Sequence, residues 1–253
     1  MDKGYNVVAG KDTRADMLMD AGVYVFETSQ TAEFFDEEQE SAFLLLSGEV
    51  EITWDSGSER ARRTSLFDQG PTCLHVPRAS KVTIRSVENG EVLIQRTDNP
   101  RQFPAKFYTP GDTADQVLGG GLMQNTARRL LRDIFNYGGA PYSNMVMGEV
   151  ITFPGRWSSF PPHHHPQPEI YFYRFDKPQG FGVSVIGGDA FVVRHNGMSA
   201  IPGGLCHPQV SAPGYAMYYC WMIRHLDGNP WLSRIDDPQH TWLLDPEANI
   251  WGY

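Results

Sequence analysis

The chain has few cysteines, no excess of basic residues and no long apolar run, and each absence excludes a class of protein. Only three cysteines occur in 253 residues, without the spacing of a disulfide framework or a zinc ribbon, so we expect reduced thiols. The formal net charge of −9 argues against a nucleic-acid or anionic-membrane partner. No stretch approaches the length of a transmembrane helix and the first residues form no apolar signal core, so we expect a soluble, cytoplasmic protein.

Turn-forming residues are abundant instead. The chain contains 25 glycines and 18 prolines, as a protein of many short strands requires, and we predict an all-β fold. Ser47-Gly48 and residues 55–58 are expected to form turns, and the charged residues 33–40 to form a surface loop. The clearest predicted strands are residues 23–28, 42–46, 49–54 and 81–85 in the first half, and 144–153, 169–175, 182–186, 190–194 and 215–224 in the second.

The strand-rich pattern occurs twice, which indicates two domains. A Gly-Glu-Val step begins at Gly48 and again at Gly148, a weak internal repeat typical of duplicated barrels. Between the halves, residues 126–135 predict a short helix, because Asn125 can cap it and its apolar side chains recur with helical spacing. We therefore predict three segments: an N-terminal barrel without a metal site over 1–100, a linker with a short helix over 101–143, and a metal-binding C-terminal barrel over 144–253.

A histidine-rich segment carries most of the chemical information. His163 and His165 are two residues apart, so they share a face if the segment is extended, which the flanking prolines favour. His164 should face away from them. Glu169 begins a predicted strand after three intervening residues, and His207 follows a Pro-Gly-Gly turn. Three imidazoles and one carboxylate suit a divalent metal in an open site that leaves room for water or substrate.

The neighbouring sequence carries a more specific signature. Residues 155–165 read Gly-Arg-Trp-Ser-Ser-Phe-Pro-Pro-His-His-His, and further matches follow in order at residues 178–182, 207–208, 213–215 and 237–242. Together they resemble the 5-deoxy-glucuronate isomerase family of the cupin superfamily, to which 4-deoxy-5-ketouronate isomerase is related. One departure is the short spacing between His165 and Glu169, where family members often carry a longer loop.

The resemblance implies a fold and a reaction. The fold is a bicupin, with two jelly-roll β-barrels in one chain and one metal site in the second. The reaction is the aldose–ketose isomerisation of 5-deoxy-glucuronate to 5-dehydro-2-deoxy-gluconate in myo-inositol catabolism. A metal there polarises the substrate carbonyl and stabilises the developing enediolate. The implied metal is one divalent ion, Zn, Mn or Fe, and its ligands by match to the family motif are His163, His165, Glu169 and His207.

The general base stays open at this point. Glu169 is one candidate, although a carboxylate bound to a metal is a poor base. A hydroxide held by the metal is a second candidate, and Tyr171 or Tyr173, which share a strand face with Glu169, is a third.

The substrate carboxylate calls for an arginine, whose planar fork suits bidentate binding. Arg132 and Arg224 are the candidates, since Arg174 alternates with Tyr173 and should point out of the barrel. Trp157 and Gln179 are expected to line the pocket.

Three rival functions fit the same ligand set. They are the related 4-deoxy-5-ketouronate isomerase, an iron-dependent cupin dioxygenase, which would need oxygen, and a non-catalytic sugar-binding bicupin, whose structural metal would be required for folding. The expected partner is a small anionic sugar acid. A homodimer is expected only by analogy, because exposed sheet edges of cupins commonly pair.

Overall fold

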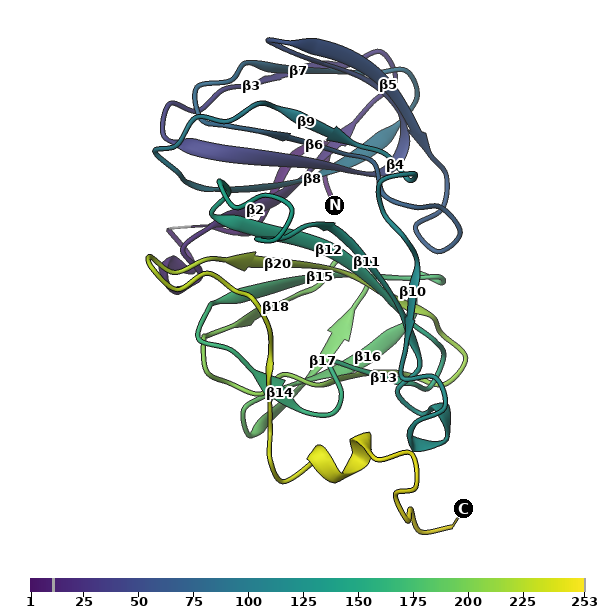
Figure 1. Cartoon of the computed structure of the whole chain (residues 1–253). Helices are drawn as coiled ribbons and strands as arrows, with labels where there is room; N and C mark the ends of the chain where they lie inside the picture. Colours follow the sequence, from purple (N-terminus) through teal and green to yellow (C-terminus); the bar gives the residue numbers. More distant parts are fainter. Residues whose placement is uncertain (11, 253) are drawn as a thin grey trace. The chain divides into compact units, whose positions relative to one another are not determined.

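The structure is a computed structural model, and it describes residues 1–10 and 12–252 (Figure 1). Within these ranges the helical elements are three short 3-10 turns, η1 (Ala15–Met17), η2 (Met123–Asn125) and η3 (Thr241–Leu244). The other regular elements of these ranges are strands, so the predicted all-β class is confirmed. A search of the same residues for a helix long and apolar enough to cross a membrane finds none.

The chain divides into two compact units. Unit 1 comprises residues 1–114 and 134–146, and unit 2 comprises residues 115–133 and the chain from Met147 onward. The sheet of unit 1 has the order β1-β2-β8-β4-β6-β9, and the far half of β4 also pairs with β5 and β7, which in turn pairs with β3. The strands are β1 (Gly4–Ala9), β2 (Asp20–Phe26), β3 (Thr31–Phe34), β4 (Gln39–Trp54), β5 (Gly57–Arg63), β6 (Cys73–Val76), β7 (Val82–Ser86), β8 (Gly90–Asp98) and β9 (Lys106–Tyr108).

The turn predicted at Ser47-Gly48 is wrong, because both residues lie inside the long strand β4. The β4–β8 register shifts between Leu45 and Ser47, so the chain forms a bulge where a reversal was expected. Gly48 has a φ of +89°, and a Cβ there would meet the Asn89 carbonyl oxygen at 2.4 Å. Glycine therefore serves a bend within one strand, which lets β4 contribute to two sets of partners.

The surface loop predicted over residues 33–40 is also partly wrong, because Glu40 is fully buried in β4. Its carboxylate accepts from the Asn144 backbone N–H and the Ser143 hydroxyl, and it lies 2.9 Å from Nε2 of His75. The His75 ring stacks on Phe135 at a centroid distance of 4.3 Å. The only histidine of the first half is thus held in a paired, aromatic environment inside unit 1.

Unit 2 contains one six-stranded sheet of order β10-β11-β12-β20-β15-β18 and one four-stranded sheet of order β13-β19-β16-β17. Tyr173 on the larger sheet donates to the Gln209 side chain on the smaller one, so the two sheets face each other. The strands are β10 (Gln116–Leu118), β11 (Arg129–Phe135), β12 (Met145–Thr152), β13 (Trp157–Ser158), β14 (His163–His164), β15 (Glu169–Phe175), β16 (Phe181–Ile186), β17 (Asp189–Arg194), β18 (Met198–Ile201), β19 (Gln209–Ser211), β20 (Met217–Arg224) and β21 (Ile235–Asp236).

The short helix predicted over residues 126–135 is wrong, since most of this segment forms β11. Leu130 and Leu131 pair with Val117 and Gln116 of β10, so tertiary pairing prevails over a weak local helical pattern. Because side chains of a strand alternate between two faces, β11 directs Arg129 and Arg132 to opposite sides.

Candidate functional site

The histidine segment is extended, as its prolines predict. His163 and His164 form β14 and pair with Asp236 and Ile235 of β21. His163 and His165 are buried, whereas His164 between them is partly exposed. Alternation along the extended backbone thus directs the first and third imidazoles of the run inward together.

The three inward-facing imidazoles share one hydrogen-bonding arrangement. Nδ1 lies 3.0 Å from the Pro161 carbonyl oxygen in His163, 3.0 Å from that of Gln167 in His165, and 2.9 Å from that of Leu205 in His207. A carbonyl oxygen only accepts, so each Nδ1 carries the proton and each Nε2 keeps a free lone pair. Backbone contacts of this kind orient histidine ligands in metal sites.

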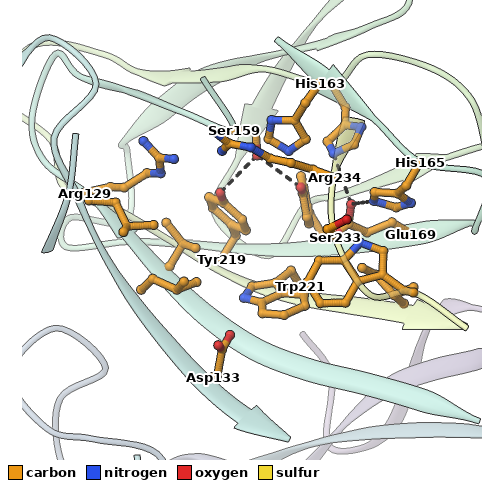
Figure 2. Close-up of a pocket in the computed structure, with 17 residues that line it drawn as sticks. Arg129, Asp133, Ser159, His163, His165, Glu169, Tyr219, Trp221, Ser233 and Arg234 are labelled. Carbon is orange, nitrogen blue, oxygen red and sulfur yellow. Dashed lines mark hydrogen bonds and ion pairs between the residues drawn. The ribbon is translucent and has the colours of Figure 1, made fainter. Parts of the chain in front are cut away.

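Glu169 lies where these lone pairs converge. Its Oε2 is 3.2 Å from Nε2 of His165 and 3.2 Å from Nε2 of His207, and the ligand atoms of these three residues lie within 4.8 Å of one another. The His163 ring lies 5.0 Å from the His207 ring, centroid to centroid. The sequence-predicted set of four side chains is therefore gathered in one place (Figure 2).

The electrostatics of this cluster fit a cation. Burial lowers the pKa of His163 to about 2 and also lowers the pKa of His207, so both rings are neutral at physiological pH. The buried Nε2 of His207 has no hydrogen-bond partner among the described residues. Neutral nitrogen lone pairs that face a carboxylate oxygen repel it unless a positive ion lies between them, so the donor set suits a divalent metal.

The cluster opens into a cavity of about 260 Å³ (Figure 2). It is bounded by the β11, β12, β15 and β20 strands and by the chain that follows β20. Its lining residues are Leu118, Arg129, Leu131, Asp133, Val150, Ser159, His163, His165, Glu169, Tyr171, His207, Tyr219, Trp221, Ile223, Trp231, Ser233 and Arg234.

Three hydroxyl groups lie beside the His–Glu cluster. The Ser159 hydroxyl is 3.2 Å from that of Tyr171 and 3.5 Å from that of Tyr219. Ser159 has a φ of 50°, a left-handed conformation that is uncommon outside glycine. Burial raises the pKa of Tyr171 and of Tyr219, so both phenols keep their protons and can donate to a ligand.

The predicted residues Tyr171 and Tyr173 differ in position. Tyr171 lines the cavity, whereas Tyr173 lies deeper between the two sheets and is not part of the lining. The Tyr173 hydroxyl bonds to Ser199 and Gln209, and burial raises its pKa. A fully buried phenol with two partners is part of the core.

The four residues predicted to bind substrate all lie outside the cavity lining. Arg132 is buried on the other face of β11, with its Nε 2.7 Å from Asp115. Arg224 donates to the His225 carbonyl oxygen and lies 3.9 Å from Asp227. Gln179 is exposed in the turn between β15 and β16, and the Trp157 ring packs on Phe160.

The cavity is also lined by polar and aromatic side chains that the sequence patterns did not indicate. Arg129 and Asp133 lie on the inner face of β11, and Trp231, Ser233 and Arg234 come from the chain after β20. Alternation would have selected Arg129 if residues 126–135 had been assigned as a strand. No local pattern marks Trp231 or Arg234, because they reach the site through the β14–β21 pairing.

The chain matches known proteins along most of its length. The model of the KduI/IolB family matches residues 2–243. A 5-deoxy-glucuronate isomerase of Geobacillus kaustophilus (strain HTA426) is 25% identical over 243 residues, which is 88% of this chain and 84% of the relative. One of Bacillus velezensis is 24% identical over 266 residues, which is 97% of this chain and 95% of the relative.

Solved structures share the fold at lower identity. An IolB-like protein from Salmonella typhimurium LT2 has a TM-score of 0.88 and 17% identity, and the match covers 97% of both chains. The oxalate decarboxylase of Lactobacillus farciminis has a TM-score of 0.67 and 11% identity, with 93% of this chain and 85% of that chain covered. These likenesses support the cupin-like β fold.

Proposed function

Because the chain belongs to the KduI/IolB family, we propose that it isomerises 5-deoxy-glucuronate to 5-dehydro-2-deoxy-gluconate. Family membership confirms the resemblance inferred from the Trp-Ser-Ser and His-x-His segments, and the curated relatives named 5-deoxy-glucuronate isomerase match most of the chain. In this role the protein serves inositol catabolism, and the presence of only three cysteines, without the spacing of a disulfide framework, suits the reducing cytoplasm proposed as its location. The observation that carries the proposal is one pocket with a His–Glu cluster and a buried arginine.

The residues that would hold a divalent metal are His163, His165, Glu169 and His207. The orientation that the three imidazoles share supports this assignment. Each ring is fixed through Nδ1, and the Nε2 atoms of His165 and His207 face Glu169. The bound ion would supply Lewis acidity at the substrate carbonyl and stabilise enediolate charge. Zn, Mn and Fe all accept such donors, so availability as well as geometry selects among them.

Glu169 is the proposed base of the isomerisation. Its Oε2 faces His165 and His207, whereas no interaction of Oε1 with another described side chain is found, and the residue lines the cavity. Oε1 is therefore placed to take the proton from the carbon beside the aldehyde and return it to the aldehyde carbon. Tyr171 keeps its phenol proton at neutral pH because its pKa is raised, so its proposed role is donation to a substrate oxygen.

An anaerobic assay of the purified protein with quantified metal tests this function. The wild type should convert 5-deoxy-glucuronate to the ketose without oxygen. His163→Ala and His207→Ala should each lose activity by at least about 100-fold. Each substitution removes a side chain proposed to bind the metal directly, whereas loss of a residue that only orients a ligand has a smaller effect. His164→Ala is the matched control: it alters the same run but lies outside the cavity lining, so its activity should stay near that of the wild type.

Other outcomes contradict the proposal in different ways. A wild type that is inactive on 5-deoxy-glucuronate but converts 4-deoxy-5-ketouronate has the related isomerase activity. Turnover that requires oxygen indicates an oxygenase instead. If His207→Ala retains full activity, the His–Glu cluster is not the reaction centre.

A further inference from the structure

Arg129 is a buried cation that forms no ion pair with any residue that the structure describes. It is 6% exposed, and its Nη1 donates to the Ala127 carbonyl oxygen at 2.9 Å. Among the described residues it makes no ion pair, and no other hydrogen bond of its guanidinium is found. Most of its five N–H donors are therefore left to the cavity that it lines.

A buried arginine without an ion pair is unusual, and Arg132 on the same strand shows the usual arrangement. Arg132 is equally buried but faces the opposite side, where it lies 2.7 Å from Asp115 and 3.5 Å from Glu149. Buried charges are normally paired, because an isolated one loses its hydration without compensation. An arginine that faces a cavity unpaired has the chemistry of a binding site for a carboxylate, which its planar fork matches in two parallel hydrogen bonds.

Arg129 and the His–Glu cluster lie at opposite ends of the pocket, so a bound ligand can contact both. Figure 2 shows Arg129 on the side of the pocket opposite His165 and Glu169. Burial lowers the pKa of Arg129, and the neighbouring charge of Arg234 lowers it further, yet a guanidinium stays protonated at neutral pH. Asp133, the acid on the same strand face, is four residues along β11, about 13 Å at strand spacing, and forms no ion pair with it.

We propose that Arg129 binds the carboxylate of the sugar-acid substrate and so directs the aldehyde end toward Glu169 and the histidines. The inference rests on the proposed isomerase function and adds the residue that selects a uronate over a neutral sugar. An uncharged aldose in this pocket would leave Arg129 desolvated and unpaired, so the arginine discriminates against it. Arg129 is then a specificity-determining residue.

A pair of ligands that differ only at the carboxylate tests the proposal by binding, without turnover. The anionic probe is 2-deoxy-gluconate, which is the product with its ketone reduced to a hydroxyl. The neutral probe is the corresponding 2-deoxy-hexitol, in which CH₂OH replaces the carboxylate. Calorimetric titration should show that the wild type prefers the anion. Arg129→Met should bind the anion about 10- to 100-fold more weakly and the hexitol unchanged, as expected for loss of a charge-assisted hydrogen bond.

Two further variants separate recognition from folding. Arg128→Met is the matched control, because the adjacent arginine is exposed and its guanidinium lies over the Phe153 ring. It should bind both probes as the wild type does. Arg129→Lys keeps the charge without the fork and should be intermediate. The melting temperature of ligand-free Arg129→Met should equal or exceed that of the wild type, because an unpaired buried charge is removed.

The outcomes for the two proposals are distinct. If Arg129→Met keeps the wild-type preference for the anion, or the wild type shows no preference, the inference about Arg129 is overturned even when the isomerase assay succeeds. If the wild type prefers the anion through Arg129 but does not turn over 5-deoxy-glucuronate, the proposed function fails and the carboxylate site stands. Should Arg129→Met fold poorly, the anion-to-hexitol affinity ratio of Arg129→Lys decides.

Discussion

Asp133 illustrates how a single residue of the pocket couples to pH. Burial raises its pKa above the ordinary 3.8, and a hydrogen bond from Gln116 offsets part of this effect. The folded state therefore holds the proton more tightly than the unfolded state. The resulting stabilisation is complete below the unfolded value and is lost as the pH rises through the folded pKa.

The substitution Asp133→Asn tests this sign. The amide stays neutral, so the variant and the wild type should differ least in free energy of unfolding near pH 3.5, and the variant should gain relative to the wild type as the pH rises toward 7. Urea unfolding across this range measures the difference and cancels the other titrating groups. A difference that does not change with pH would show that Asp133 is solvated like an ordinary surface carboxylate.

The conformation of β11 determines which arginine side chain faces the pocket. Read as a helix, residues 126–135 place Leu130, Leu131 and Ile134 on one side and leave Arg132 as a candidate for the substrate. Read as a strand, they send Arg129 inward and Arg132 outward. Local spacing fits both readings, and the choice is made by pairing with β10, which no pattern inside the segment encodes.

The outward face of β11 predicts a structural role for Arg132. Its Nη1 lies 3.5 Å from Glu149, which is fully buried and accepts from the Tyr218 hydroxyl. Arg132→Met leaves this carboxylate without its cation, so we expect a loss of about 3–5 kcal/mol in the free energy of unfolding. Denaturant unfolding measures this loss, and kcat/KM of the folded protein should change little. A loss of activity at unchanged stability would instead return Arg132 to the substrate.

The extended segments explain why the clustering of the candidate metal ligands was predictable and the pocket wall was not. His163, His165 and Glu169 are close in sequence, and prolines enforce the extended conformation that brings the two imidazoles to one side. Trp231 and Arg234 instead reach the cavity because the chain after β20 returns to pair β21 with β14. Sequence spacing therefore predicts a site well when its residues are close along the chain. It predicts poorly the residues that reach a site only when distant strands pair.

At the scale of the whole molecule, the two units differ in the chemistry of their histidines. In unit 1 the single imidazole of His75 lies 2.9 Å from the Glu40 carboxylate through its Nε2, and its Nδ1 has no hydrogen-bond partner among the described residues. In unit 2 three imidazoles are held through Nδ1 by backbone carbonyl oxygens, and the Nε2 atoms of His165 and His207 face Glu169. The sequence predicted two strand-rich halves, and the structure has two units, but residues 134–146 belong to unit 1 although they follow residues 115–133 of unit 2. A division along the chain could not anticipate this exchange, because it depends on which strands pair.

This difference predicts that metal binding stabilises unit 2 and leaves unit 1 unchanged. Protein stripped by a chelator should stay folded but inactive, because an open site of four side chains adds to a sheet that already has its own core. Adding the metal at 100 times its Kd should stabilise the folded state by about 2.7 kcal/mol. Hydrogen–deuterium exchange should then slow in residues 163–175 and 205–224 of unit 2 and stay unchanged in β4 of unit 1, and His163→Ala should reduce the effect.

Either of two results would contradict this picture. Complete loss of protection in unit 2 on chelation would make the metal a structural requirement, as in a non-catalytic binding protein, because structural sites contribute their binding free energy to folding. Equal slowing in β4 and β15 would place metal binding outside the His–Glu cluster or couple it to both units. Selective slowing, with activity restored in proportion to bound metal, would tie the ion to the cluster that contains His165, Glu169 and His207.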